Sequence, residues 1–134
     1  MKTEEKDLLL KELCARLPYG VKCIFHSTKG DIPATITEID KKYERVSYKP
    51  DESTITYYNF VENIKPYLRP MSDMTELEDK EYALLQVDFY TDGFLYPIPA
   101  SNMINWLNEH HFDYQGLIER DLALEAPEGM YKFE

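Results

Sequence analysis

Apolar positions near the start of the chain recur with the spacing of an α-helix. Leu9, Leu13 and Leu17 follow one another at intervals of four residues, and charged residues occupy most of the positions between them. This spacing places the leucines on one side of a helix and the charges on the other. Pro18 cannot continue a helix and therefore ends it. The pattern predicts a helix over residues 3–17.

From residue 21 onward the period changes to two, which is typical of β-strands. Turn residues separate five short stretches rich in Val, Ile, Thr and Tyr, namely 21–26, 32–39, 45–48, 54–60 and 64–69. Short antiparallel strands at this spacing favour a small, strongly bent barrel, because closure leaves no open edge. We therefore predict an SH3-like barrel of five antiparallel strands, with an OB-like barrel or an open sheet as the alternatives. Pro66 favours an edge position for the fifth strand.

The second half of the chain has mainly helical patterns. Thr75 and Glu78 have the spacing of a capping box, which opens a predicted helix that ends near residue 86. The aromatic stretch 87–96 contains an aspartate–glycine pair, a signal for a turn or hairpin. Ser101 can cap a helix that ends near residue 110, and Asp113 can cap one more short helix over the next five residues.

Composition changes this picture only in detail. The chain has 134 residues, of which 43% are apolar and 30% charged, so it can bury one core and is not disordered as a whole. No run approaches the roughly 20 apolar residues that span a membrane, and the charged start is unlike a signal peptide. We expect a cytoplasmic α+β protein. We expect residues 1–71 to form the N-terminal helix and the barrel, and residues 72–134 to form an acidic, mostly helical region packed on them as one compact unit.

The formal charge of −10 is concentrated in the second half. Residues 1–70 carry 12 basic and 11 acidic residues, whereas residues 71–134 carry 3 and 14. Because an acidic surface repels a phosphate backbone, nucleic acid is not expected as a partner of the second half. A basic patch within the first half remains an alternative. The acidic half either faces a basic partner, mimics a polyanion or is a solvated surface.

Few residues suggest metal or catalytic chemistry. Cys14 and Cys23 are expected to be free thiols, and no second ligand pair follows Cys23 and His26 to complete a zinc site. His110 and His111 would point about 100° apart on a helix, and the charge of a histidine near a helix C-terminus explains them without a metal. The motifs of P-loops, dinucleotide-binding folds, serine hydrolases and zinc proteases are absent from the sequence. We expect no metal, no cofactor and no enzymatic activity.

Eleven tyrosines are many for a chain of this length, and eight lie between residues 43 and 96. Tyrosine combines a large contact area with a polar tip, which suits both a thin core and a binding surface. Basic residues close to the aromatic ones in sequence would suit a groove for a peptide or a single strand of nucleic acid. The candidate binding residues are Tyr48, Tyr57, Tyr58, Lys65, Tyr67 and Arg69.

Several stretches carry a resemblance to other proteins. They are 17–22 (LPYGVK), 64–71 (IKPYLRPM) with 74–76 (MTE), 105–108 (NWLN), 113–118 (DYQGLI) and 123–131 (ALEAPEGMY). Together these stretches resemble a group of small proteins from gut anaerobic bacteria, their prophages and their mobile elements. The resemblance covers most of the chain and implies a cytoplasmic protein of phage origin. It carries no known activity, and no functional residue can be transferred from it.

From these observations we predict a non-catalytic interaction module that binds another protein. Nucleic-acid binding through the N-terminal half and an enzyme of unrecognised type are the two alternatives. The sequence leaves the oligomeric state open.

Overall fold

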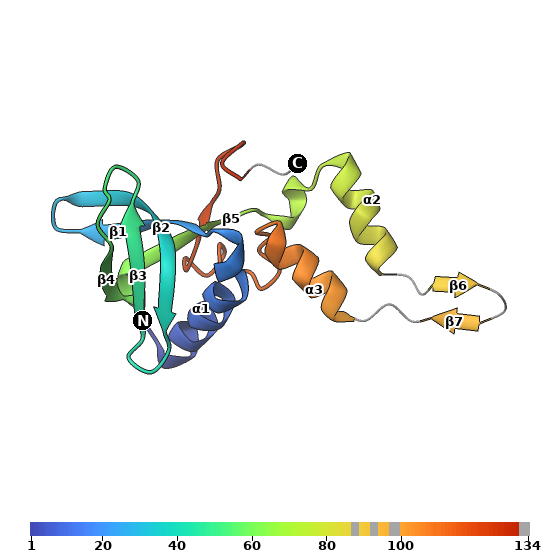
Figure 1. Ribbon diagram of the computed structural model, residues 1–134, viewed down its shortest axis with the longest axis horizontal. Coiled ribbons are helices and arrows are strands. Elements are labelled where there is room, and N and C mark those ends of the chain that lie inside the picture. Colours follow the sequence, from blue (N-terminus) through green and yellow to red (C-terminus); the bar gives the residue numbers. More distant parts are fainter. Residues whose placement is uncertain (87–88, 92–93, 97–99, 132–134) are drawn as a thin grey trace.

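The computed structural model describes residues 1–86, 89–91, 94–96 and 100–131. Three helices and eight strands follow one another along these ranges (Figure 1). The N-terminal half contains α1 (Thr3–Arg16), β1 (Lys22–Ser27), β2 (Gly30–Asp40), β3 (Arg45–Pro50), β4 (Tyr57–Phe60) and β5 (Ile64–Leu68). The C-terminal half contains α2 (Glu76–Leu85), β6 (Phe89–Thr91), β7 (Phe94–Tyr96), α3 (Ala100–Glu109) and β8 (Leu124–Glu125). Short 3-10 turns lie at Leu17–Tyr19 (η1), Val61–Asn63 (η2) and Met71–Asp73 (η3).

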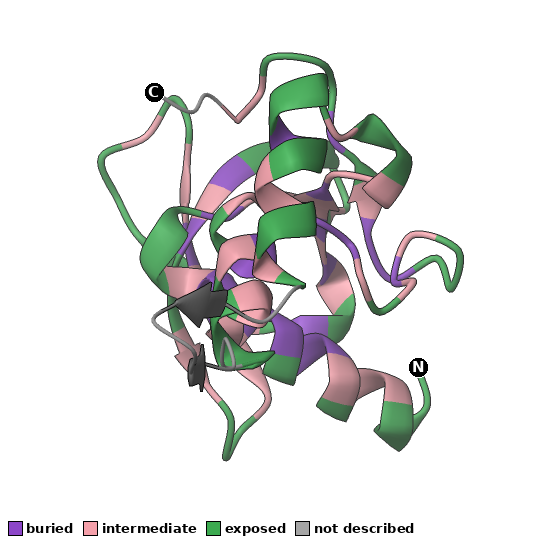
Figure 2. Ribbon diagram, turned by 90° about the vertical axis from the view of Figure 1, so that its right-hand side faces the viewer, coloured by how far each residue is buried: buried purple, intermediate pink, exposed green. Residues whose placement is uncertain are grey.

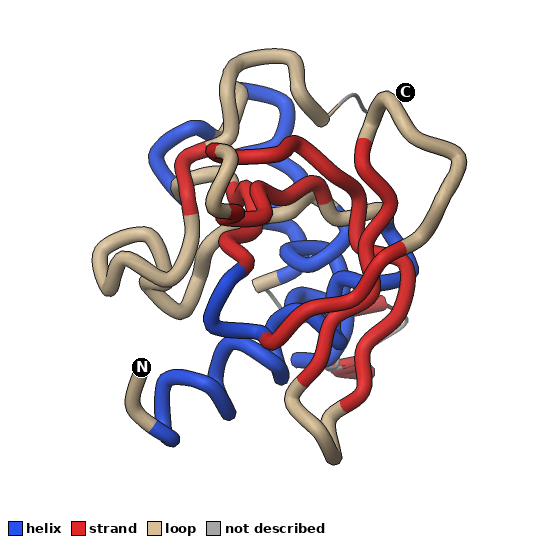
Figure 3. Tube along the Cα trace, turned by 90° about the vertical axis from the view of Figure 1, so that its left-hand side faces the viewer, coloured by secondary structure: helices blue, strands red, loops and turns tan. Residues whose placement is uncertain are grey.

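Six of the strands form one mixed sheet in the order β4-β3-β2-β1-β5-β8. Strands β1 to β4 are an antiparallel meander, and β5 returns beside β1 after η2. The last strand, β8, runs parallel to β5 and pairs with Tyr67 and Leu68. The register of β2 on β3 shifts between Ile36 and Glu38, and the strands bend strongly (Figure 3).

The core lies between α1 and the inner face of this sheet. The leucines at positions 9 and 13 of α1 are almost completely buried, as the helical spacing predicted. Alternate residues of the strands meet them, including Cys23, Ile36 and Val46. Leu117, Leu122 and Ala123 of the C-terminal half are buried in the same cluster. Figure 2 shows the buried segments, in purple, inside the molecule, with exposed turns and helix faces around them.

The prediction of a closed barrel is wrong, and the open sheet, kept as an alternative, is the observed form. The five predicted strands are all present, but no pairing of the described strands joins β4 to the other end of the sheet. The side of β5 that faces away from β1 pairs with β8, which comes from the acidic half of the chain. A barrel would need that side of β5 for closure.

Pro66 lies in an inner strand and not at an edge, which corrects a second expectation. In β1, the N–H and C=O groups of successive residues point alternately to β2 and to β5. The backbone nitrogen of Ile36 donates to the carbonyl of Val21, so the peptide groups of Cys23, two residues later, also face β2. Pro66 stands opposite Cys23, in a pair that exchanges no ladder hydrogen bonds. Its nitrogen points away from β1, at a position before β8 begins to pair with Tyr67. The proline therefore costs no hydrogen bond there.

The capping box that opens α2 is confirmed. The hydroxyl of Thr75 accepts from the backbone nitrogen of Glu78, and the carboxylate of Glu78 accepts from the nitrogen of Thr75. The aromatic stretch before α3 forms a two-stranded sheet of β6 and β7, although the predicted turn Asp92-Gly93 lies outside the described residues.

The short helix predicted after Asp113 is absent from its place, where the chain forms turns. The side chain of Asp113 still accepts from the backbone nitrogens of Leu117 and Ile118, at 2.8 and 2.9 Å. The side chain of Asp113 therefore caps a turn and not a helix, because two hydrogen bonds from backbone N–H groups stabilise a turn as well as a helix start.

A buried ion pair ties the C-terminal half to α1. The guanidinium of Arg16 lies 2.6 Å from the carboxylate of Glu12, and it also donates to the carbonyl of Phe112 at 2.7 Å. Both charged side chains are nearly inaccessible to water. A buried charge needs such partners, so removal of either one would leave the other uncompensated.

No helix of the described ranges is long and apolar enough to cross a membrane.

Candidate functional site

An acidic groove of about 1380 Å³ lies between α2, α3 and the C-terminal segment 125–131. Six carboxylates line it: Asp73, Glu78, Glu81, Glu109, Glu125 and Glu128. Arg69 and His110 are the basic residues among the lining side chains that the structure describes. The lining also includes Leu77, Trp106 and Tyr131, so apolar and aromatic surface accompanies the negative charge. We refer to this site as the acidic groove.

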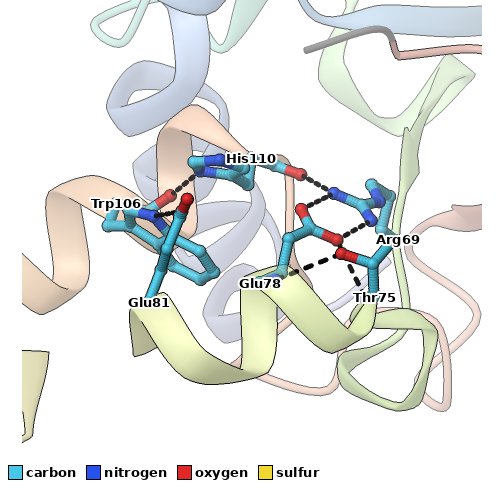
Figure 4. A network of polar contacts seen from close by, with 6 residues as sticks. All are labelled: Arg69, Thr75, Glu78, Glu81, Trp106 and His110. Atoms are coloured by element: carbon cyan, nitrogen blue, oxygen red, sulfur yellow. Dashed lines mark hydrogen bonds and ion pairs between the residues drawn. The ribbon is translucent and has the colours of Figure 1, made fainter. Parts of the chain in front are cut away.

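The base of the acidic groove is the ion pair of Arg69 and Glu78 (Figure 4). Two guanidinium nitrogens of Arg69 lie 2.7 and 2.8 Å from the two carboxylate oxygens of Glu78, in a bidentate arrangement. These bonds, together with those from Thr75, lower the pKa of Glu78 to about 2. Arg69 also stacks over the ring of Phe112 at 4.2 Å and donates to the carbonyl of His110. Its charge is therefore already satisfied within the fold.

Trp106 projects from α3 at the centre of an aromatic cluster. Its ring stacks on His110 at 4.2 Å and on Phe112 at 5.8 Å, and it meets Tyr82 of α2 edge to face. The indole nitrogen donates to the carboxylate of Glu81 across the gap between the two helices (Figure 4). These contacts fix α2 against α3 and place the carboxylate of Glu81 beside the indole ring.

The C-terminal segment forms the opposite wall and is anchored through Tyr131. Its hydroxyl accepts from the backbone nitrogen of Lys22 at 3.0 Å and lies 2.8 Å from the carbonyl of Tyr67, to which it donates. Its ring stacks on the imidazole of His111, with 3.7 Å between the ring centres. Burial raises the pKa of Tyr131, which keeps its hydroxyl protonated as a donor.

His111 is not the cationic histidine that its place after α3 led us to expect. It is buried, and its backbone has a positive φ of 61° just past the helix end. Burial, and next the positive charge of Arg16, lower the pKa of His111 to about 4. The side chain is therefore neutral at pH 7 and acts as an aromatic support for Tyr131.

The six candidate binding residues do not come together on one surface. Tyr48 points into the core, where its ring stacks on Phe25 at 4.8 Å and is 5% exposed. Tyr57 and Tyr58 lie on β4 at the end of the sheet, and both are exposed. As the alternation of a strand predicts, their side chains lie on opposite faces.

Lys65 and Tyr67 lie on β5, separated from β4 by three strands. The ammonium of Lys65 is paired with the carboxylate of Asp121 at 2.7 Å. Arg69 follows β5 and belongs to the acidic groove, but as the partner of Glu78. The structure therefore separates the proposed tyrosine surface into a core residue, an exposed strand at one end and a paired region at the other.

No sequence motif identifies Trp106, Glu109 and Glu128 as members of one site. They come from α3 and from the C-terminal segment, which no motif links. The available signal was the excess of 14 acidic over 3 basic residues after position 70, together with the lone tryptophan. Charge composition locates an acidic region, whereas the groove itself depends on how the three segments meet.

Cys23 and His26, considered above as a ligand pair, do not converge. Cys23 is buried in the core, and burial raises the pKa of its thiol to about 12. His26 is exposed and lies 2.7 Å from the carboxylate of Asp31. Among the residues that the structure describes, no group of three or more His, Cys, Asp or Glu side chains could hold a metal ion.

Comparison with protein-family models, with curated proteins and with solved structures finds no match to this chain.

Proposed function

We propose that the protein is a non-catalytic interaction module that binds a basic segment of another protein in the acidic groove. One observation carries this proposal. A concave site of about 1380 Å³ combines six carboxylates with apolar and aromatic side chains. Protein-binding sites combine concave shape, aromatic anchors and complementary charge in this way.

Charge favours a cationic ligand. Glu78 is compensated by Arg69, and Glu81 is engaged with the indole of Trp106. The other four groove carboxylates, at positions 73, 109, 125 and 128, belong to exposed residues. Four negative charges close together raise the local concentration of a basic ligand and its association rate. The same field disfavours the phosphates of a nucleic acid.

Apolar surface favours a peptide over a simple cation. Leu77 is 67% exposed on the rim of the acidic groove, and Trp106 lies on its wall. Lysine and arginine side chains can lay their aliphatic stems on such surface while their charged ends reach the carboxylates. A segment with two or more basic residues therefore fits both properties of the site.

The fluorescence of Trp106 can report binding in the acidic groove, because it is the single tryptophan of the chain. The probes are a 12-residue peptide containing four lysines or arginines among alanine and leucine, and the same peptide with glutamates in place of the basic residues. We expect the basic peptide to change the fluorescence of Trp106 saturably, with an affinity that falls as salt rises. The acidic peptide should produce no change.

Charge-neutralising variants distinguish the site from general acidity. Glu109→Gln combined with Glu128→Gln removes two exposed groove carboxylates and should weaken binding by about tenfold, about 1.4 kcal/mol. The matched control, Glu4→Gln combined with Glu52→Gln, removes the same charge from exposed positions outside the acidic groove. Equal loss in both double variants, or no binding by wild type at low salt, would refute the proposal.

A further inference from the structure

Exposed apolar side chains gather at the opposite end of the molecule from the acidic groove. Tyr43, Ile55, Tyr57, Tyr58 and Phe60 are each 48–63% exposed. They lie on β4 and the turns next to it, at the end of the sheet in Figure 1 that is distant from α2 and α3. We call this set the β4 edge. Open sheet ends in native proteins are normally short, charged or covered, so a concentration of aromatic side chains at one requires an explanation.

The backbone of the β4 edge offers hydrogen bonds to another strand. The backbone nitrogen of Val61 donates to the carbonyl of Glu44. Counting back along β4 from Val61, the N–H and C=O groups of every second residue therefore face β3. By this alternation the peptide groups of Tyr57 and Asn59 face β3, and those of Tyr58 face outward. The outward nitrogen of Phe60 is bonded to the side chain of Asn59 at 2.7 Å. Tyr58 is therefore the centre of the outward-facing edge.

Side-chain contacts join the β4 edge into one patch. The guanidinium carbon of Arg45 lies 4.9 Å from the centre of the Tyr43 ring and 5.0 Å from that of Tyr58. Tyr57 stacks toward the buried Tyr48 on the inner face, with 6.2 Å between the ring centres. The patch thus presents aromatic surface on both faces of the strand, above and below its backbone edge.

The charges around the β4 edge balance locally. The ion pairs and ring contacts beside it involve three basic and three acidic side chains, namely Lys6, Lys42 and Arg45 with Asp40, Glu44 and Glu62. A chain of net charge −10 repels a second copy of itself over most approaches, and most strongly through its acidic half. The β4 edge lets two copies meet without bringing acidic surfaces together, whereas it offers no net charge to attract a strongly basic or acidic partner.

We propose that a second copy of this chain pairs with the β4 edge. The two β4 strands run antiparallel about a twofold axis at Tyr58. The Tyr58 nitrogen of each copy donates to the Tyr58 carbonyl of the other, so the two sheets become continuous. Such an isologous contact needs one self-complementary patch, and a strand edge with outward donor and acceptor on the same residue meets that need.

The area available fits a reversible dimer. Five large side chains, each about half exposed, can remove roughly 500 Å² of surface per copy from water. A standard interface takes about 800 Å² per partner, and small interfaces below this size belong to weak complexes. We therefore expect a dissociation constant in the micromolar range.

The test is sedimentation equilibrium of the full chain between about 1 and 500 μM. Wild type should shift from the chain mass to twice that mass over this range. Tyr58→Pro removes the outward N–H, which the fold does not use, and Tyr58→Lys places like charges opposite each other across the axis. Each should weaken the dimer at least tenfold. The matched control is Leu84→Lys, at a position on α2 that is 67% exposed, and it should dimerise as wild type does.

Hydrogen exchange of the wild-type protein gives an answer that does not depend on variants. The Tyr58 amide should exchange quickly in dilute protein and slowly in concentrated protein, while the amides of Tyr57 and Asn59 are protected in both. A chain that stays monomeric up to 500 μM would overturn the proposal. So would a dimer in which the Tyr58 amide stays unprotected, or one that both Tyr58 variants leave intact.

Discussion

At the scale of single residues, Glu78 connects the start of α2 to the base of the acidic groove. It closes the capping box with Thr75 and forms the bidentate pair with Arg69. Both members of the pair are largely buried, so neither can regain water when the other is removed. The residue therefore stabilises a helix start and also prevents Arg69 from neutralising the exposed groove carboxylates.

We predict that Glu78→Gln lowers the free energy of unfolding by about 2–3 kcal/mol at pH 7, as measured by urea denaturation. Because folding lowers the pKa of this carboxyl from 4.5 to about 2, its stabilisation is complete above pH 4.5 and is lost as the pH falls toward 2. The difference between wild type and variant should shrink over that interval. A difference that stays constant from pH 5 to pH 2 would contradict the assignment. Glu76→Gln, at an exposed position on the same helix, serves as the control.

At the scale of elements, the C-terminal segment has two structural tasks. Its strand β8 covers one side of β5, and its residues 125–131 form a wall of the acidic groove. Tyr131 holds the segment to β1 and β5 through one hydroxyl. The wall of the candidate site is thus attached to the core sheet by a few specific contacts.

Tyr131→Phe should therefore loosen this wall while the rest of the fold remains. Removing the hydroxyl leaves the backbone nitrogen of Lys22 and the carbonyl of Tyr67 without their bonds to it, which costs about 1–2 kcal/mol. We expect faster hydrogen exchange at Lys22 and in residues 124–131, and a matching fall in the unfolding free energy. Tyr43→Phe, at an exposed position, should change neither quantity. Unchanged exchange in the segment of the Tyr131 variant would show that other contacts hold it.

At the scale of the whole molecule, the two halves of the chain share one core and have separate surfaces. Leu117, Leu122 and Ala123 are buried with the leucines of α1. The buried pair of Glu12 and Arg16, and the neutral His111 near it, lie where the halves meet. The proposed surface for a second copy lies on β4, and the proposed surface for a basic partner lies between α2, α3 and the C-terminal segment. Figure 1 shows β4 at the end of the molecule away from α2 and α3. Occupation of one site therefore leaves the other accessible.

Acid should weaken this junction of the halves first. Folding lowers the pKa of His111 from 6.5 to about 4, so the unfolded chain binds a proton more readily between these values. The stability is full above pH 6.5 and falls as the pH drops to 4, by up to about 3 kcal/mol. His111→Phe keeps a ring against Tyr131 but cannot titrate, so its stability should change less over that interval in urea denaturation. Parallel profiles for the two proteins would assign the acid sensitivity to another group.

Local patterns in the sequence correctly predicted most of the helices and strands. The helix spacing of Leu9 and Leu13, the alternation of the five strands and the capping box of Thr75 and Glu78 each depend on residues close together in the chain. Backbone geometry and local hydrogen bonds decide such features, so the sequence shows them directly. The same alternation places Tyr57 and Tyr58 on opposite faces of their strand.

Only the tertiary structure decided whether the sheet closes and where the binding residues lie. The sheet stays open because two residues from the acidic end, Leu124 and Glu125, pair with β5, and so short a strand has no periodicity to detect. Burial of Tyr48, pairing of Lys65 with Asp121 and the lowered pKa of His111 all depend on neighbours far away in the sequence. The sequence by itself therefore determined which elements form and where negative charge accumulates. Long-range packing decided which side chains meet, because burial and charge compensation belong to the folded arrangement and not to any one segment.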